Sequence, residues 1–328
     1  MHIGGNLETT TSIELTAKLR AEKIDRSTAW KRIRRGWQLY LLLLLPMAWL
    51  LTFMYYPMYG AQIAFRDFLP GDGIWGSEWV GFANFTRFFN SPMFVRVIRN
   101  TLTLSLYTLV AGFPIPIIFA LLLNQIRDGL FKKTIQMVSY APHFISTVVM
   151  VGMIMQFFDL RYGPINLMLK AVGMNPINFL GSAEIFPSLY VWTGVWQNTG
   201  FSTIIYLAAL TTIDPALHEA AVVDGANRLQ RIWYIDIPGI LPVAATLLIL
   251  NMGQVMNVGF EKTFLMQNPL NLSTAEVIST YVYKVGLAAG VVNFSYASAI
   301  GLFNSVIGFI LLLIANRISK KITETSLF

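Results

Sequence analysis

The sequence has 328 residues, of which 55% are hydrophobic and 12% charged, and its formal net charge is +7. Soluble globular proteins carry about 25% charged residues, so this composition excludes an ordinary soluble domain and indicates a membrane protein. The absence of cysteine excludes disulfides, thiolate metal sites and cysteine nucleophiles. The basic residues lie in short segments between long apolar runs, which is typical of charges that orient membrane helices and not of a nucleic-acid binder.

Six uncharged stretches are long enough to cross a bilayer, which requires about 20 mostly apolar residues. They cover residues 37–56, 101–124, 135–158, 185–210, 239–260 and 296–316. We therefore expect an all-α integral membrane protein with six transmembrane helices. The expected organisation is an N-terminal tail at 1–36, a membrane domain at 37–316 and a C-terminal tail at 317–328.

The distribution of basic residues predicts the orientation of these helices. Sixteen of the 24 Lys and Arg residues lie in the two tails and in the segments 127–133 and 211–238, and the other eight lie in the opposite loops. An even number of spans places both tails on one side, and that side carries the basic excess. Both termini are therefore expected to be cytoplasmic.

The cytoplasmic segment 214–238, between the fourth and fifth stretches, predicts a helix, a break and a second helix. Asp214 can cap the first helix, and Gly225 can adopt the left-handed conformation that ends it. The small residues Ala220 and Ala221 leave one helix face flat, so another protein can approach closely. This pattern indicates a docking element.

The same segment resembles the EAA motif of permease subunits in bacterial ABC importers. That motif consists of Glu-Ala-Ala, three residues, Gly, and a hydrophobic-x-hydrophobic-Pro ending. The matching positions are Glu219, Ala220, Ala221, Asp224, Gly225, Ala226 and Ile235-Asp236-Ile237-Pro238. The segments 159–166 and 196–201 are similar to sugar permeases, and 56–60 and 232–235 are similar to the LplB-like branch, which is associated with complex polysaccharides, including alginate.

This resemblance implies a type I ABC importer permease in the bacterial inner membrane that takes up oligosaccharide or polysaccharide. It also implies partners: a second, homologous permease subunit, a dimer of ABC ATPases and an extracytoplasmic solute-binding protein. No Gly-x-x-x-x-Gly-Lys-Ser/Thr loop occurs in the sequence, so ATP and Mg²⁺ are expected on the separate ATPase. We expect no catalytic residue, metal site or cofactor in this chain, and ATPase docking through Glu219, Ala220, Ala221, Asp224 and Gly225.

A polar stripe on the fifth stretch is the candidate substrate path. Residues at i, i+3 and i+6 stay within about 120° of one helix face, and uncharged amides suit sugar hydroxyl groups. The expected path residues are Asn251, Gln254, Asn257 and Asn198, with Trp192 and Trp196 as surfaces on which a sugar ring can stack. The alternative is that the amides only bond to neighbouring helices. His143 likewise either contacts substrate or packs with a hydrogen-bonded partner.

Two other classes of protein fit the sequence less well. A secondary transporter or channel for a small polar solute usually holds charged residues inside its spans, and the six stretches hold none. A membrane-embedded enzyme needs a nucleophile with a base or a cluster of metal ligands, but the chain has three scattered histidines and no cysteine. The expected outward surface has eight basic and seven acidic residues, which leaves the charge of the substrate open.

Overall fold

The computed structural model describes residues 34–288, 290 and 292–323, so most of the tail 1–36 and the end of the tail 317–328 lie outside it. The chain divides into two compact units, Met1–Ala61 and Gln62–Phe328. The described part is mainly helical. Its one small sheet pairs β1 (Arg66–Asp67) antiparallel with β2 (Glu78–Trp79).

The first unit contains α3 (Trp37–Leu50), a π-helical turn (Leu51–Tyr55) and α4 (Tyr56–Met58). None of the residues in these three elements is buried, although nearly all are apolar. A helix that is apolar on every side suits a lipid environment or a protein partner and does not suit water. The wide turn directly precedes Pro57, whose ring would otherwise clash with the carbonyl four residues earlier.

The second unit contains the remaining helices. The first half comprises a 3₁₀ turn (Tyr59–Phe65) that begins in the first unit, α5 (Gly73–Gly76), α6 (Ala83–Phe89), α7 (Pro92–Gly112), α8 (Pro114–Asn124), α9 (Leu130–Tyr140), a second 3₁₀ turn (Ala141–Phe144), α10 (Thr147–Phe157) and α11 (Pro164–Ala171). The second half comprises α12 (Phe186–Thr211), α13 (Pro215–Val223), α14 (Arg228–Arg231), a π turn (Ile232–Asp236), α15 (Ile237–Gly253), α16 (Phe260–Met266), α17 (Leu272–Ala275), α18 (Ile278–Tyr283), a π turn (Lys284–Ala288) and α19 (Phe294–Thr323).

Helices of membrane-spanning length overlap each of the six predicted stretches. Four are continuous: Trp37–Phe65, Pro92–Asn124, Arg228–Gly253 and Phe294–Arg317. Two bent pairs bring the number to at most six: Leu130–Phe144 with Thr147–Phe157, and Phe186–Thr211 with Pro215–Val223.

The prediction of one continuous helix over 135–158 is wrong, because the two parts of this stretch meet at 101°. The break follows from local chemistry. Pro142 lies in the 3₁₀ turn, Ile145 is extended, and the Ser146 side chain caps α10 by accepting a hydrogen bond from the Val149 amide. A new helix therefore begins at Thr147 in a new direction.

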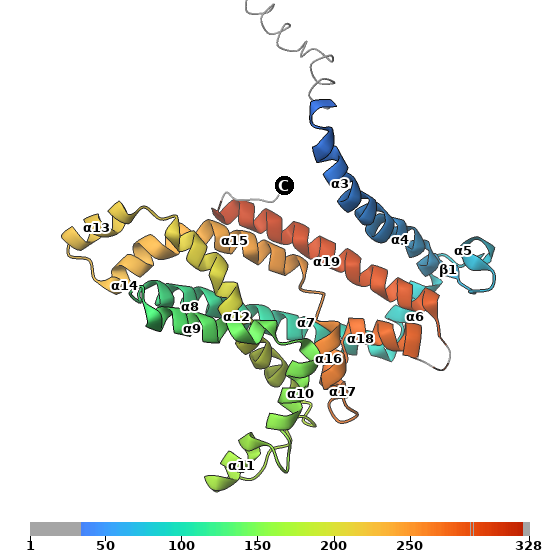
Figure 1. Cartoon of the computed structure of the whole chain (residues 1–328). Helices are drawn as coiled ribbons and strands as arrows, with labels where there is room; N and C mark the ends of the chain where they lie inside the picture. Colours follow the sequence, from blue (N-terminus) through green and yellow to red (C-terminus); the bar gives the residue numbers. More distant parts are fainter. Residues whose placement is uncertain (1–33, 289, 291, 324–328) are drawn as a thin grey trace, which may run out of the picture. The chain divides into compact units, whose positions relative to one another are not determined.

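Helix α12 lies at the centre of the second unit and packs against α7, α8, α9 and α15, while α15 runs along α19 (Figure 1). Tyr206 of α12, Leu121 of α8 and Ile240 of α15 share one buried cluster. Because lipid is as apolar as these side chains, tight packing holds such helices together. Gly200 allows the closest approach, since a Cβ there would overlap the backbone of Ser139 at the end of α9.

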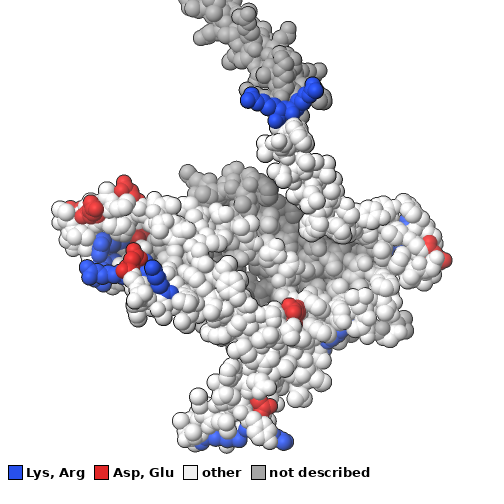
Figure 2. All heavy atoms as spheres, viewed as in Figure 1, with Lys and Arg blue, Asp and Glu red and all other residues white. Residues whose placement is uncertain are grey.

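Many charged side chains on the visible surface of this unit gather at two places. Figure 2 shows them over α13 and α14 and again over α11, with mostly uncharged atoms between. Bilayer hydrocarbon excludes charged groups, so this separation is the one that a membrane-spanning unit requires.

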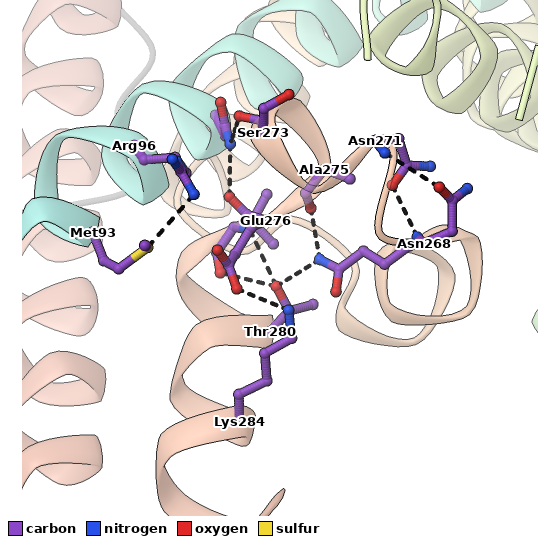
Figure 3. Close-up of polar contacts among 12 residues, drawn as sticks. Met93, Arg96, Asn268, Asn271, Ser273, Ala275, Glu276, Thr280 and Lys284 are labelled. Atoms are coloured by element: carbon purple, nitrogen blue, oxygen red, sulfur yellow. Dashed lines mark hydrogen bonds and ion pairs between the residues drawn. The ribbon is translucent and has the colours of Figure 1, made fainter. Parts of the chain in front are cut away.

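A polar network joins the segment from α16 to α18 to helix α7. The Asn100 amide of α7 donates to the backbone carbonyls of Ser273 and Glu276, each at 2.9 Å. The Lys284 ammonium lies 2.8 Å from the Glu276 carboxylate, as Figure 3 shows. The Gln267 amide also donates to backbone and side-chain oxygens of the same segment. Hydrogen bonds thus add to the apolar packing of these short helices.

Candidate functional site

The segment 214–238 has the predicted conformation of helix, break and second helix. Asp214 caps α13, because its Oδ1 accepts from the Ala216 amide at 2.9 Å. Gly225 has φ of +81°, the left-handed conformation, and ends the helix. The next helix begins with a capping box between Asn227 and Gln230. The predicted cap and the predicted glycine conformation are both confirmed.

Helix α13 has no buried residue. Glu219, Ala220 and Asp224 are exposed, as are the apolar side chains Leu217 and Val223, the latter 86% exposed. An apolar helix face of this kind, with acidic residues beside it, is typical of a surface that contacts another protein. The residues predicted for docking therefore lie together on one accessible element.

His218 of α13 faces a buried carboxylate. Its Nε2 lies 3.3 Å from Oδ1 of Asp236, whose side chain is fully buried in the π turn before α15. Gln125 Nε2, at the end of α8, lies 3.4 Å from the other carboxylate oxygen. Sequence reasoning included Asp236 only as a position of the motif and did not predict this pair. The available signal is a carboxylate two residues before Pro238, at the start of the apolar stretch.

A polar cavity of about 400 Å³ lies between α7, α12 and the end of α15. Its wall combines hydroxyl and amide side chains and one lysine with apolar residues such as Leu109, Phe113 and Val255. The polar lining residues are Ser105, Thr108, Tyr190, Gln197, Asn198, Thr199, Ser202, Asn251, Gln254, Asn257 and Lys262. Four predicted path residues, Asn198, Asn251, Gln254 and Asn257, are among them.

The predicted stripe on one continuous helix is wrong, although its three residues do meet at the cavity. Helix α15 ends at Gly253, Gln254 is its C-cap, and Asn257 lies in the irregular segment that follows. A Cβ at Gly253 would lie 2.5 Å from Cδ1 of Leu312 of α19, so the glycine lets Leu312 pack closely against α15. Glycine weakens the helix at this point and permits the turn.

The amides of the stripe differ in their hydrogen bonding. The Asn257 side-chain amide donates to Oε1 of Gln254 at 2.9 Å, and the Asn304 amide of α19 donates to Oδ1 of Asn257 at 3.3 Å. The Asn251 amide has no hydrogen-bond partner among the residues that the structure describes, and it is exposed. Asn251 therefore offers both a donor and an acceptor to a bound molecule.

The two predicted stacking residues lie away from this cavity. Trp192 and Trp196 line a mostly apolar cavity of about 590 Å³ with residues of α8 and α9, and Trp192 Nε1 donates to the Tyr107 hydroxyl at 2.9 Å. Six residues separate Trp192 from Asn198, which is a rotation of about 240° on a helix. The two side chains therefore point about 120° apart around the helix, and in the structure they line different cavities.

His143 packs within the protein with a hydrogen-bonded partner. Its ring stacks on Phe201 with centroids 3.9 Å apart, and its Nδ1 lies 3.0 Å from Asn198 Oδ1. The Asn198 amide nitrogen donates to the Gly194 carbonyl at 3.0 Å. Both ends of the Asn198 amide are thus held by the protein, and Asn198 shapes the cavity wall.

Lys262 is the cavity residue that sequence reasoning did not single out. Its Nζ lies 2.8 Å from the Tyr190 carbonyl oxygen and 4.7 Å from the centre of the Tyr190 ring. Burial lowers its pKa to about 8. Sequence reasoning counted it as a loop charge because it follows the fifth stretch by two residues. It lies at the start of α16, where its ammonium reaches the Tyr190 carbonyl of α12, and it therefore forms part of the cavity wall.

Comparison with known proteins identifies the family. Residues 112–324 match the family described as binding-protein-dependent transport system inner membrane component. LplB of Bacillus subtilis (strain 168) is 44% identical over 296 residues, which are 90% of this chain and 92% of LplB. The polygalacturonan/rhamnogalacturonan transport system permease protein YteP of the same strain is 44% identical over 290 residues, 88% of this chain and 90% of YteP.

A solved structure shares the fold. A chain in the crystal structure of a bacterial ABC transporter involved in the import of the acidic polysaccharide alginate is 41% identical, with a TM-score of 0.83. The match covers 90% of this chain and 99% of that chain. The family match, these relatives and the apolar helices lead to one identification. The chain belongs to the family of inner membrane components of binding-protein-dependent transport systems and is a multi-pass permease subunit of a bacterial ABC importer.

Proposed function

We propose that this subunit imports oligosaccharide or polysaccharide through the polar cavity beside Asn251. The observation that carries the proposal is the cavity wall, which joins hydroxyl and amide groups from three helices and leaves Asn251 unpaired. Such groups match the alternating donors and acceptors of a sugar. The printed names of YteP, a polygalacturonan/rhamnogalacturonan permease, and of the alginate transporter support a saccharide.

The proposal includes the arrangement of the complex. Six transmembrane helices cross the membrane with both termini in the cytoplasm, and a second permease subunit completes the pathway. A dimer of ABC ATPases binds ATP and Mg²⁺ and docks at Glu219, Ala220, Ala221, Asp224 and Gly225. A periplasmic protein delivers the substrate; one alginate transporter structure is a complex with such a protein. The exposed face of α13 supports the docking role.

Saccharide uptake by the complex reconstituted in vesicles tests the proposal. The double variant Asn251→Leu/Gln254→Leu should raise the substrate concentration for half-maximal uptake while basal ATP hydrolysis and assembly persist. A matched control is Asn90→Leu/Gln156→Leu, which removes two exposed amides that do not line this cavity.

Two results would count against the proposal. A wild-type complex that takes up no saccharide would refute the substrate class. Unchanged concentration dependence in the Asn251→Leu/Gln254→Leu complex would show that these amides serve packing alone.

A further inference from the structure

The ammonium group of Lys262 lies in the polar cavity without an anionic partner. The ion pairs found among the described residues are Lys132 with Asp128, His218 with Asp236, and Lys284 with Glu276. None includes Lys262, whose Nζ is instead held by the neutral carbonyl of Tyr190. A partly buried cation without an anion is costly, so proteins usually supply the anion or bind one.

The surroundings of Lys262 hold the charge in place. Gly194 of α12 leaves room for the ammonium, since a Cβ there would lie 3.2 Å from Nζ. The Thr263 hydroxyl donates to the Gly259 carbonyl at 2.8 Å, which fixes the first turn of α16. The Asn100 and Gln267 bonds fix the segment that follows. Lys262 is therefore a built feature of the cavity and not a freely moving surface side chain.

Lys262 is the only positively charged residue among those that line the cavity. Among its lining residues the only other titratable group is the Tyr190 hydroxyl, and the rest are neutral. Asn251, with its free amide, is on the same wall. A ligand that pairs with the Lys262 ammonium and with the Asn251 amide combines a negative charge with hydroxyl groups.

We propose that Lys262 binds the carboxylate of an acidic saccharide and gives the permease a preference for uronic-acid chains over neutral chains. This inference rests on the proposed saccharide function and names the substrate class of the same cavity. The ammonium forms a charge-assisted hydrogen bond to the carboxylate, while the amides bond to hydroxyl groups. A bond of this kind corresponds to a change in affinity of about tenfold to hundredfold.

The experiment compares two saccharides that differ only in charge: a short oligomer of galacturonic acid and the same oligomer with its carboxyl groups reduced to alcohols. Binding of each to the purified transporter complex is measured without the periplasmic protein, so that its selectivity does not enter. In the Lys262→Gln complex we expect binding of the acidic oligomer to weaken at least tenfold and binding of the reduced oligomer to be unchanged. Lys262→Arg should retain the preference.

The control is Lys170→Gln, which removes an exposed charge of α11 that does not line the cavity and should have no effect. Equal weakening of both oligomers in Lys262→Gln would show a structural role and overturn this inference, while the saccharide function would stand. Loss of the second permease subunit from that variant complex would show that the lysine pairs with the partner subunit, and this too would overturn it. A wild-type complex that binds the acidic oligomer no more tightly than the reduced one would overturn this inference, while the saccharide function is tested separately by uptake.

Discussion

Nε2 of His218 lies 3.3 Å from Oδ1 of Asp236, and this pair joins the exposed helix α13 to the helix that continues into α15. Asp236 is fully buried, while His218 remains partly accessible. The far end of α15 carries Asn251 at the cavity. We predict that a movement of α13 reaches the cavity wall through this side-chain pair and this helix, as a rigid-body form of coupling.

His218→Ala is expected to separate ATP hydrolysis from transport. Oδ1 of the buried Asp236 carboxylate loses its partner, which costs about 1–3 kcal/mol and loosens α13 from the helix behind it. We expect fewer substrate molecules transported per ATP, with the ATPases still bound. The single variant Asp236→Asn and the double variant His218→Ala/Asp236→Asn complete a double-mutant cycle. Additive losses in the cycle would mean that the two side chains do not act together.

Gly225→Val should abolish transport and weaken ATPase association while leaving membrane insertion intact. At φ of +81° a β-branched side chain is strained, so the end of α13 must change direction. Copurification of the ATPase and substrate-stimulated ATP hydrolysis measure the effect.

Gly225→Asn is the matched control for this variant, because asparagine tolerates the left-handed conformation. It should keep most of the activity. Normal stimulated hydrolysis in the valine variant would refute the docking assignment.

Binding of an acidic saccharide should weaken as pH rises through about 8, since burial lowers the pKa of Lys262 to about 8 and the ammonium is charged below that value. The titratable groups near Lys262 do not explain this loss of binding with rising pH. Tyr190 is a neutral donor, Tyr283 of α18 packs on Phe260 and Phe264, α10 carries no titratable residue, and the neighbouring Glu261 is exposed.

Affinity measured from pH 7 to 9 should therefore fall for the wild-type complex and stay constant for Lys262→Arg, whose guanidinium remains charged throughout. The uncharged Lys262→Gln complex should bind weakly at every pH. A parallel fall in wild type and Lys262→Gln would assign the pH dependence to another group.

Gly200→Ala should destabilise the protein by about 1–3 kcal/mol, because the added methyl group overlaps the Ser139 backbone and separates α12 from α9. Gly152→Ala in α10 is the control, since a Cβ there meets nothing within 4 Å. Thermal unfolding in detergent compares the two. Equal midpoints would show that α9 moves aside without cost.

The orientation can be tested because the chain has no cysteine. Ser12→Cys and Ser326→Cys should be shielded from an impermeant reagent in intact cells, and Asp72→Cys should be labelled. Asp72 is exposed, whereas the nearby Ser77 is buried and donates to the Gly73 carbonyl, so Asp72 is the better reporter. Labelling of both tails from outside would reverse the proposed topology.

Features that depend on local chemistry could be predicted from the sequence. The Asp214 cap and the left-handed Gly225 need only neighbouring backbone, and both were found. The end of α15 at Gly253 lies where Leu312 of α19 packs, far along the chain, and spacing alone predicts a helix that continues to Asn257. The place of Lys262 depends on contact between α16 and α12, which no local pattern contains.

The π turn Ile232–Asp236 also determines which way α15 faces. A π turn holds one residue more than an α turn, and each residue rotates a helix by about 100°. Deleting one residue within this turn would restore ordinary winding and rotate α15 about its axis relative to α13. Asn251 would then leave the cavity while α13 and Gly225, which precede the turn, stayed intact. The number of residues between the two prolines at 215 and 238 is therefore as constrained as their identity.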